Sequence, residues 1–193
     1  MPNKSTMGEW VGRMLETQLP ATYYYHNAEH TRYVVDKALE IARHENCTAE
    51  ETRLIEVAAW WHDTGFLTTY ANHEEAGCIL AKAQLPGYGF ANGEINIICG
   101  MIMATKIPQT PINKLEAILA DADLEYLGTA TAAIRAEWLL KEIQSITPTL
   151  TRPVWNRIQI SFLQAHHYFT GFCRLTKEPV KQAYLQQLIA ASK

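Results

Sequence analysis

Apolar positions recur at a spacing of three and four residues along almost the whole chain. This spacing places the apolar side chains on one face of an α-helix. No run of strict alternation is long enough to predict a β-strand. The pattern therefore predicts an all-α protein, with helices at about residues 7–18, 27–45, 48–62, 72–84, 92–104, 112–127, 130–145, 151–168 and 180–191.

Several of these helices begin at a recognisable start signal. Three pairs of residues have the spacing of a capping box or of a proline in the first turn: Thr48 with Glu51, Asn72 with Glu75, and Thr151 with Pro153. Segments 85–89 and 106–111 contain proline, with glycine in the first of them, and are expected to be loops. Neither segment is long enough to be an interdomain linker, so the pattern predicts a single domain over residues 1–193.

Composition narrows the class of protein. The chain has 193 residues, of which 48% are hydrophobic, enough to bury one substantial core. The net charge of −3 gives no basic surface for nucleic acid, so no nucleic-acid partner is expected. The longest apolar stretch, 95–103, is too short to span a membrane. Four scattered cysteines without a CxxC pair, and a polar start without a secretory leader, favour a cytoplasmic protein with reduced thiols.

Histidines and aspartates form the most informative pattern. His26 and His30 are one helical turn apart, and the pair His62-Asp63 ends an apolar helix that should deliver both side chains to a largely buried place. An ionised carboxylate out of water needs a partner, a metal or a helix end to cap. Together with an aspartate near residue 122, these residue types suit a first-row divalent metal with coordination positions left open for water.

The periodicity of segment 115–126 helps to choose between two aspartates. Asp123 lies closer to the centre of the apolar face than Asp121 does. Asp123 is therefore the expected ligand, whereas Asp121 is expected either to orient a ligand or to face solvent.

The ordered series His30, His62-Asp63 and Asp123 on an all-α chain resembles the H…HD…D pattern of the HD-domain metal-dependent phosphohydrolases. The resemblance implies an HD-type helical bundle with a motif core at 25–128 and C-terminal helices at 130–193 packed on it. It also implies that these four residues are the metal ligands and that Asp63 is able to bridge a second ion.

Segment 25–30 reads Tyr-His-Asn-Ala-Glu-His and also resembles the cyclic nucleotide phosphodiesterases, which share the HD architecture. In those enzymes the first histidine of the motif protonates the leaving oxygen, so the resemblance gives this role to His26. An imidazole near neutral pH can donate such a proton. The alternative is that His26 only supports a ligand.

Two further residues are candidates for substrate binding. His73 can contact a substrate phosphate, ligate a second metal or cap its helix. Lys106 can pair with a phosphate or simply face solvent. His166 and His167 match no part of the family motif, and packing is their expected role.

The sequence thus predicts a metal-dependent phosphohydrolase or phosphodiesterase that acts on a small phosphate ester, with a nucleotide favoured, through metal-activated water, with Asp63 and His26 in catalytic roles. The expected metal is one of Mn, Zn, Ni, Co, Fe or Mg, bound at one site. Whether a second metal site exists is left open. The alternatives are a di-iron oxygenase of the HD type and a non-catalytic module that senses a ligand. The substrate is a small molecule, no membrane partner is expected, and a homo-oligomer is left open.

Overall fold

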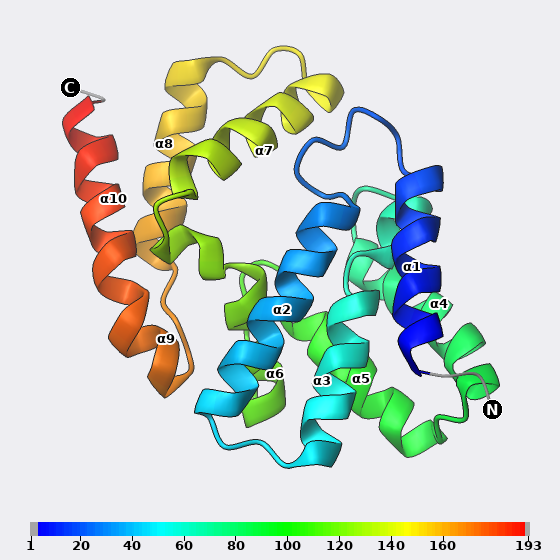
Figure 1. The fold of residues 1–193 in the computed structure, drawn as a ribbon. Coiled ribbons are helices and arrows are strands. Elements are labelled where there is room, and N and C mark those ends of the chain that lie inside the picture. The colour runs from blue at the N-terminus through cyan, green and yellow to red at the C-terminus, as the bar shows by residue number, and fades with distance from the viewer. Residues whose placement is uncertain (1–3, 192–193) are drawn as a thin grey trace.

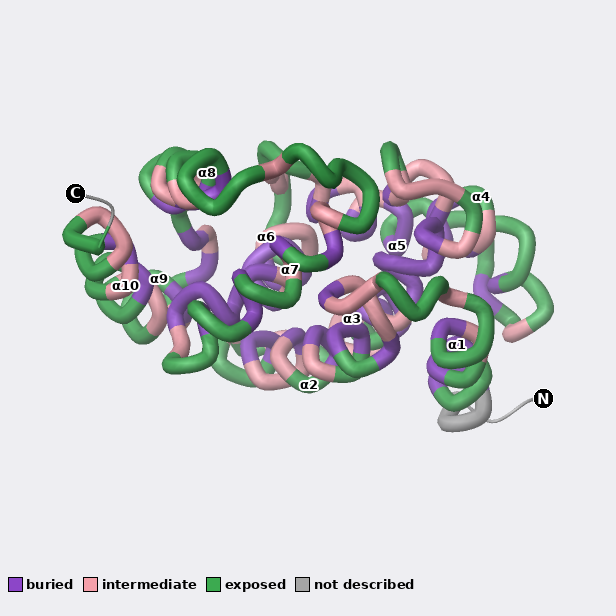
Figure 2. The backbone as a smooth tube through the Cα atoms, turned by 90° about the horizontal axis from the view of Figure 1, so that it is seen from above, coloured by how far each residue is buried: buried purple, intermediate pink, exposed green. Residues whose placement is uncertain are grey.

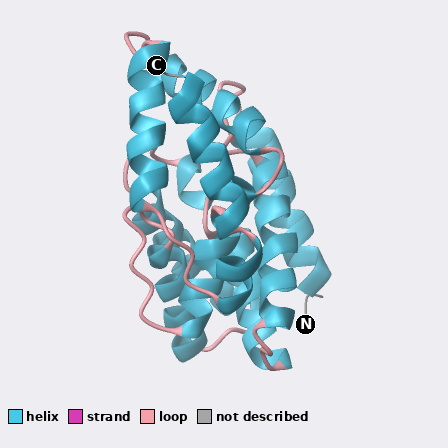
Figure 3. Ribbon diagram, turned by 90° about the vertical axis from the view of Figure 1, so that its left-hand side faces the viewer, coloured by secondary structure: helices cyan, strands magenta, loops and turns pink. Residues whose placement is uncertain are grey.

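The computed structural model describes residues 4–191, and the side chains from residue 7 onward. Within that range it contains helices and loops but no strand (Figure 3). The α-helices are α1 (Lys4–Gln18), α2 (Ala28–His44), α3 (Ala49–Trp61), α4 (His73–Gln84), α5 (Asn92–Ala104), α6 (Lys114–Asp123), α7 (Ala132–Ile146), α8 (Arg152–Ala165), α9 (Gly171–Thr176) and α10 (Glu178–Ala191). Three short 3-10 helices lie between them: η1 (Thr64–Leu67), η2 (Leu85–Tyr88) and η3 (Glu125–Gly128). The predicted all-α, single-domain fold class is confirmed.

The main core lies among α2, α3, α5 and α6, which pack side by side at the centre of Figure 1. Trp61, Ile55 and Ile102 are completely buried there. Burial of an apolar side chain of this size stabilises the fold by about 1.5–3 kcal/mol. α1 and α4 cover this core at the end nearest the N-terminus.

Helices α8 to α10 lie at the end of the molecule opposite α1, and α7 extends from there towards the centre (Figure 2). α10 packs on η3, α8 and α9, and η3 also contacts α6 and α7, so η3 connects these helices to the main core. Trp155 and Leu163 of α8 are buried, whereas Val154 and Ile158 on the same helix are exposed.

The start signals read from the sequence are confirmed in part. Thr48 and Glu51 form the predicted capping box at the start of α3. Pro153 lies in the first turn of α8, as predicted. Asn72 was expected to cap α4, but it adopts a left-handed conformation, with φ 56°, and its side chain makes no cap hydrogen bond.

Two predicted helices end earlier than the apolar pattern suggested. The helix expected over 112–127 stops at Asp123, and the short 3-10 helix η3 follows it with Glu125, Tyr126 and Leu127 buried. The helix expected over 151–168 stops at Ala165, and the short helix α9 was missed. These breaks shape the wall of the site described below.

No helix between residues 4 and 191 is long and apolar enough to cross a membrane.

Candidate metal centre and adjoining cavity

The start of α2 fixes the position of His30. The Asn27 side chain accepts hydrogen bonds from the backbone N–H groups of Glu29 and His30, at 2.9 and 3.1 Å. This N-cap sets the first helical turn. As a result the His30 imidazole, 2% exposed, points into the core beside α6.

Two histidines and two aspartates converge at this place. The His30 Nε2 atom lies 3.1 Å from Asp123 Oδ1 and 3.4 Å from Asp63 Oδ2. The His62 Nε2 atom lies 3.2 Å from Asp63 Oδ2 and 3.7 Å from Asp123 Oδ1. Ligand atoms about 2.1 Å from one ion lie roughly 3.0–3.4 Å apart. His30, His62 and Asp123 each offer one ligand atom in a group close enough to share a cation, and Asp63 lies beside both histidines.

Unpartnered atoms support the same conclusion. The Nδ1–H group of His62 donates to the carbonyl of Ala59 at 2.7 Å, which leaves the Nε2 lone pair facing the carboxylates. His62 Nε2 and Asp63 Oδ2 are buried and lie 3.2 Å apart, but neither makes a hydrogen bond of acceptable geometry among the described residues. Buried polar atoms without partners are costly, and a divalent cation would satisfy both. The donor set therefore fits such an ion.

The pKa values of His62 and Asp63 reflect the short distances between imidazoles and carboxylates in this cluster. Burial lowers the pKa of His62, but the adjacent carboxylates of Asp63 and Asp123 outweigh it and raise this pKa to about 9. Burial raises the pKa of Asp63, and the imidazoles of His62 and His30 outweigh it, so this pKa is lowered. A cation entering the site would displace the proton from His62, so its binding should release a proton.

Gly65 allows a third histidine to approach the cluster. A Cβ atom at position 65 would lie 1.8 Å from the carbonyl oxygen of His73, so only glycine fits between η1 and α4. This packing places His73 Nε2 3.6 Å from Asp63 Oδ1 and 3.6 Å from an oxygen of Glu74. The ring of His73 stacks on Phe66, with 3.8 Å between ring centroids.

His26 lies at the same opening but is held by a different residue. Its Nδ1–H group donates to Glu142 of α7 at 2.5 Å, and its backbone N–H donates to the other oxygen of that carboxylate at 3.0 Å. Glu142 also accepts from the backbone of Tyr25 and from the Tyr70 hydroxyl. Burial lowers the pKa of His26, and the Glu142 hydrogen bond outweighs it, so this pKa is raised. Since Nδ1 is occupied, Nε2 is the ring atom left to move a proton.

Asp121 has neither of the roles expected for it. Its side chain is completely buried, so it does not face solvent. Its oxygens accept hydrogen bonds from the backbone N–H groups of Phe169 and Thr170 and from the Thr170 hydroxyl. These contacts hold the chain between α8 and α9 against α6.

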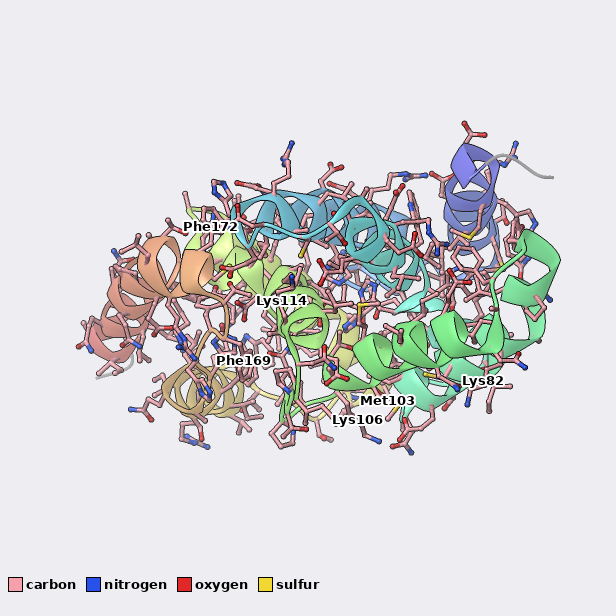
Figure 4. All side chains as sticks on the ribbon, turned by 90° about the horizontal axis from the view of Figure 1, so that it is seen from below. Lys82, Met103, Lys106, Lys114, Phe169 and Phe172 are labelled. Atoms are coloured by element: carbon pink, nitrogen blue, oxygen red, sulfur yellow. The ribbon has the colours of Figure 1, made fainter. Side chains whose placement is uncertain are left out.

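Lys106 follows α5 and lies near Met103 in Figure 4. Its ammonium group pairs with Glu75 and donates to the Asn72 side chain at 3.1 Å. The side chain is 38% exposed and borders the cavity. It is therefore already engaged by a carboxylate rather than free for a phosphate.

A cavity of about 490 Å³ opens beside the cluster. Five of the residues singled out from the sequence line it: His26, Asp63, His73, Lys106 and Asp123. His30 and His62 do not appear in its lining, and both are buried. His166 and His167 lie outside the lining; His166 instead contacts the ammonium group of Lys181.

Comparison with known proteins relates this arrangement to a fold. One similar solved structure is a predicted HD superfamily hydrolase from an uncultured Thermotogales bacterium, with 21% identity over 100% of this chain and 94% of that chain, at a TM-score of 0.66. The chain has the HD fold. A second similar solved structure, of a protein from Lactobacillus plantarum, matches 99% of this chain and 98% of its own at 17% identity and a TM-score of 0.68. No protein-family model matches the sequence. No curated protein matches it either.

Sequence reasoning missed Glu142, the residue that orients His26. Glu142 sits 116 positions away on a helix whose neighbouring residues, Leu139 and Ile143, are apolar. The one feature of the sequence that could have indicated a role for Glu142 is its carboxylate beside the apolar face of this helix. Glu74, next to His73, was also missed as part of the cavity lining.

Proposed function

We propose that this protein is a metal-dependent hydrolase of a small phosphate ester. The observation that carries the proposal is the convergence of His30, His62, Asp63 and Asp123, with buried donor atoms that lack partners. The description of an HD-fold neighbour as a predicted HD superfamily hydrolase supports the same class.

The four residues would hold one divalent cation, of Mn, Zn, Ni, Co, Fe or Mg. Such an ion, when bound, lowers the pKa of a coordinated water towards neutrality and withdraws charge from a phosphoryl oxygen. Asp63 lies between the histidines and the cavity, and would keep the attacking water close to the substrate. His73 and Glu74, next to Asp63, would line the opposite side of the phosphate or complete a second cation site.

His26 would act as the general acid. Its Nδ1–H bond to Glu142 holds the ring at the cavity wall, and the nearby carboxylate favours the protonated imidazolium. The Nε2 proton is then available for the leaving alkoxide, a transfer worth about 10²–10⁴-fold in rate. Lys106 would steer the phosphate group only after exchanging its contact with Glu75.

A phosphodiesterase activity, a nucleotide substrate and a cytoplasmic location stay predictions from the sequence. A panel of phosphate monoesters, diesters and nucleotides tests the proposed class directly. With added manganese the protein should release product, and chelation or Asp63→Asn should abolish the release. Hydrolysis that survives both treatments would refute the proposal.

A further inference from the structure

One end of the cavity differs in chemistry from the metal centre. Six apolar side chains from η3, α7 and α8 form what we call the apolar arm: Leu127, Leu139, Ile143, Trp155, Phe162 and Leu163. Leu127, Trp155 and Leu163 are 4%, 4% and 2% exposed, so the far wall belongs to the protein core. The whole cavity falls within the roughly 300–1,000 Å³ that is typical of pockets for small organic ligands.

Polar groups are few near this arm. Gln159 and Tyr184 line it, and the Tyr184 hydroxyl donates to the Gln159 side-chain oxygen at 3.2 Å. The indole N–H of Trp155 is buried without a partner among the described residues and offers one donor. These few groups do not match the edge of a nucleobase, whose several donors and acceptors each lose water on binding. An apolar group has no such cost in this place.

The charge of the lining limits the number of phosphates. Among the described residues that line the cavity, the carboxylates are Asp63, Glu74 and Asp123, and Lys106 is the one lysine or arginine. Three carboxylates against Lys106 and the protonated ring of His26 leave the lining one charge negative, and one divalent cation changes this to one charge positive. A diphosphate or triphosphate chain would add anionic groups without a cation to receive them. One phosphoryl group is the better match.

We propose that the substrate is a phosphate monoester whose alcohol is an apolar alkyl or aryl group, with the phosphoryl group at the metal centre and the apolar group in the apolar arm. This proposal rests on the proposed hydrolase function and names its substrate class. The oxygen of water forms a bond to phosphorus, and the ester P–O bond breaks. The leaving oxygen takes a proton from His26, and the water proton returns to the histidine, so the products are an alcohol and inorganic phosphate.

A series of unbranched alkyl phosphates tests the arm, because their leaving alcohols are almost equally basic while their apolar area grows. With manganese-loaded protein, kcat/KM should rise by about two- to fourfold for each methylene added from ethyl to hexyl phosphate, as expected for burial of each group. Hexyl phosphate should also exceed adenosine 5′-monophosphate and adenosine 5′-triphosphate. Equal values along the series, or a preference for the triphosphate, would overturn the proposal.

A matched pair of variants on α7 locates the effect. Leu139→Asn places a polar amide in the arm and should reduce the hexyl-to-ethyl ratio of kcat/KM by about tenfold. Ile134→Asn changes an exposed position of the same helix that lies outside the cavity lining, and should leave the ratio unchanged. An unchanged ratio in Leu139→Asn, with the fold intact by circular dichroism, would place the apolar group elsewhere and refute the assignment.

Binding without turnover separates this proposal from the hydrolase function. Hexylphosphonate and ethylphosphonate cannot be hydrolysed, and calorimetry with the manganese-loaded protein should show at least tenfold tighter binding of the hexyl compound. If this preference appears but no ester is hydrolysed, the hydrolase function is refuted, whereas the binding of an apolar group in the apolar arm is supported. If esters are hydrolysed but both phosphonates bind equally, the arm fails and the hydrolase function stands.

Discussion

The Glu142 carboxylate accepts a hydrogen bond of 2.5 Å from the His26 ring, although 116 positions separate the two residues. The same carboxylate accepts the backbone N–H groups of Tyr25 and His26. Glu142 therefore fixes both the ring and the chain just before α2, and ties α7 to the connection that arches towards it in Figure 1. If His26 is the general acid, Glu142 is its positioning residue.

Replacing Glu142 with glutamine should slow hydrolysis of an alkyl phosphate by about 10- to 100-fold, because the imidazolium loses its carboxylate partner. The loss should be smaller for nitrophenyl phosphate, whose leaving group departs without a proton. Glu137→Gln is the matched control, since Glu137 lies on the same helix but pairs with Arg152 at the surface. An equal loss for both substrates in Glu142→Gln would show that Glu142 only maintains the fold.

Gly65→Ala should destabilise the protein by about 3 kcal/mol, measured by urea unfolding, because the new Cβ atom would collide with the backbone of His73. Gly93→Ala is the control: a Cβ there meets no atom within 4 Å, and alanine in a helix should be neutral or favourable by up to about 1 kcal/mol. Equal stability of the two variants would mean that η1 and α4 are not packed as described.

Asp121 and Asp123 should respond in opposite ways to substitution by asparagine. Asp121→Asn should cost about 2–4 kcal/mol in the free energy of unfolding, because a buried acceptor of three hydrogen bonds is altered, while metal content stays unchanged. Asp123→Asn should fold normally and lose metal. Denaturation and elemental analysis of both variants check this, and the reverse pattern would exchange the two assignments.

His166 should make stability depend on pH. Burial first, and then the ammonium group of Lys181 and the neighbouring His167, lower the pKa of His166 to about 3, against the opposing effect of Glu178. As pH falls below 6.5 the unfolded chain binds a proton that the folded chain refuses, so stability is lost, by about 2 kcal/mol at pH 5. Well above pH 6.5 His166 is neutral in both the folded and the unfolded chain, so it causes no such loss of stability.

His166→Gln should therefore lose less stability than the parent protein between pH 7 and pH 5, measured by urea unfolding at each pH. His167→Gln changes the exposed neighbour and serves as the control. A parent-like loss of stability in His166→Gln would show that His166 is not held neutral by its surroundings.

The sequence was sufficient for the fold class, because helical spacing of apolar residues is a local property and recurs throughout the chain. The order His30, His62-Asp63, Asp123 indicated which side chains should meet, and in the structure each of the two imidazoles lies 3.1 to 3.7 Å from an oxygen of each of the two carboxylates. Periodicity also separated Asp123 from Asp121.

The remaining features depend on contacts between distant parts of the chain. Nothing near Glu142 in the sequence indicates that it reaches His26, and nothing near Asp121 indicates a bond to Thr170. The left-handed conformation of Asn72, just before the point where α4 packs on η1, is likewise not indicated by the Asn-x-x-Glu spacing. Tertiary packing overrode the local signal in each case.

The central claim is that His30 and His62, with the two aspartates, bind a divalent metal while His26 does not. Elemental analysis after manganese loading and dialysis tests it most directly. We expect about one equivalent of metal in the parent protein and in His26→Ala, and almost none in His30→Ala or His62→Ala. Metal retained in both His30→Ala and His62→Ala, or absent from the parent protein, would contradict the account.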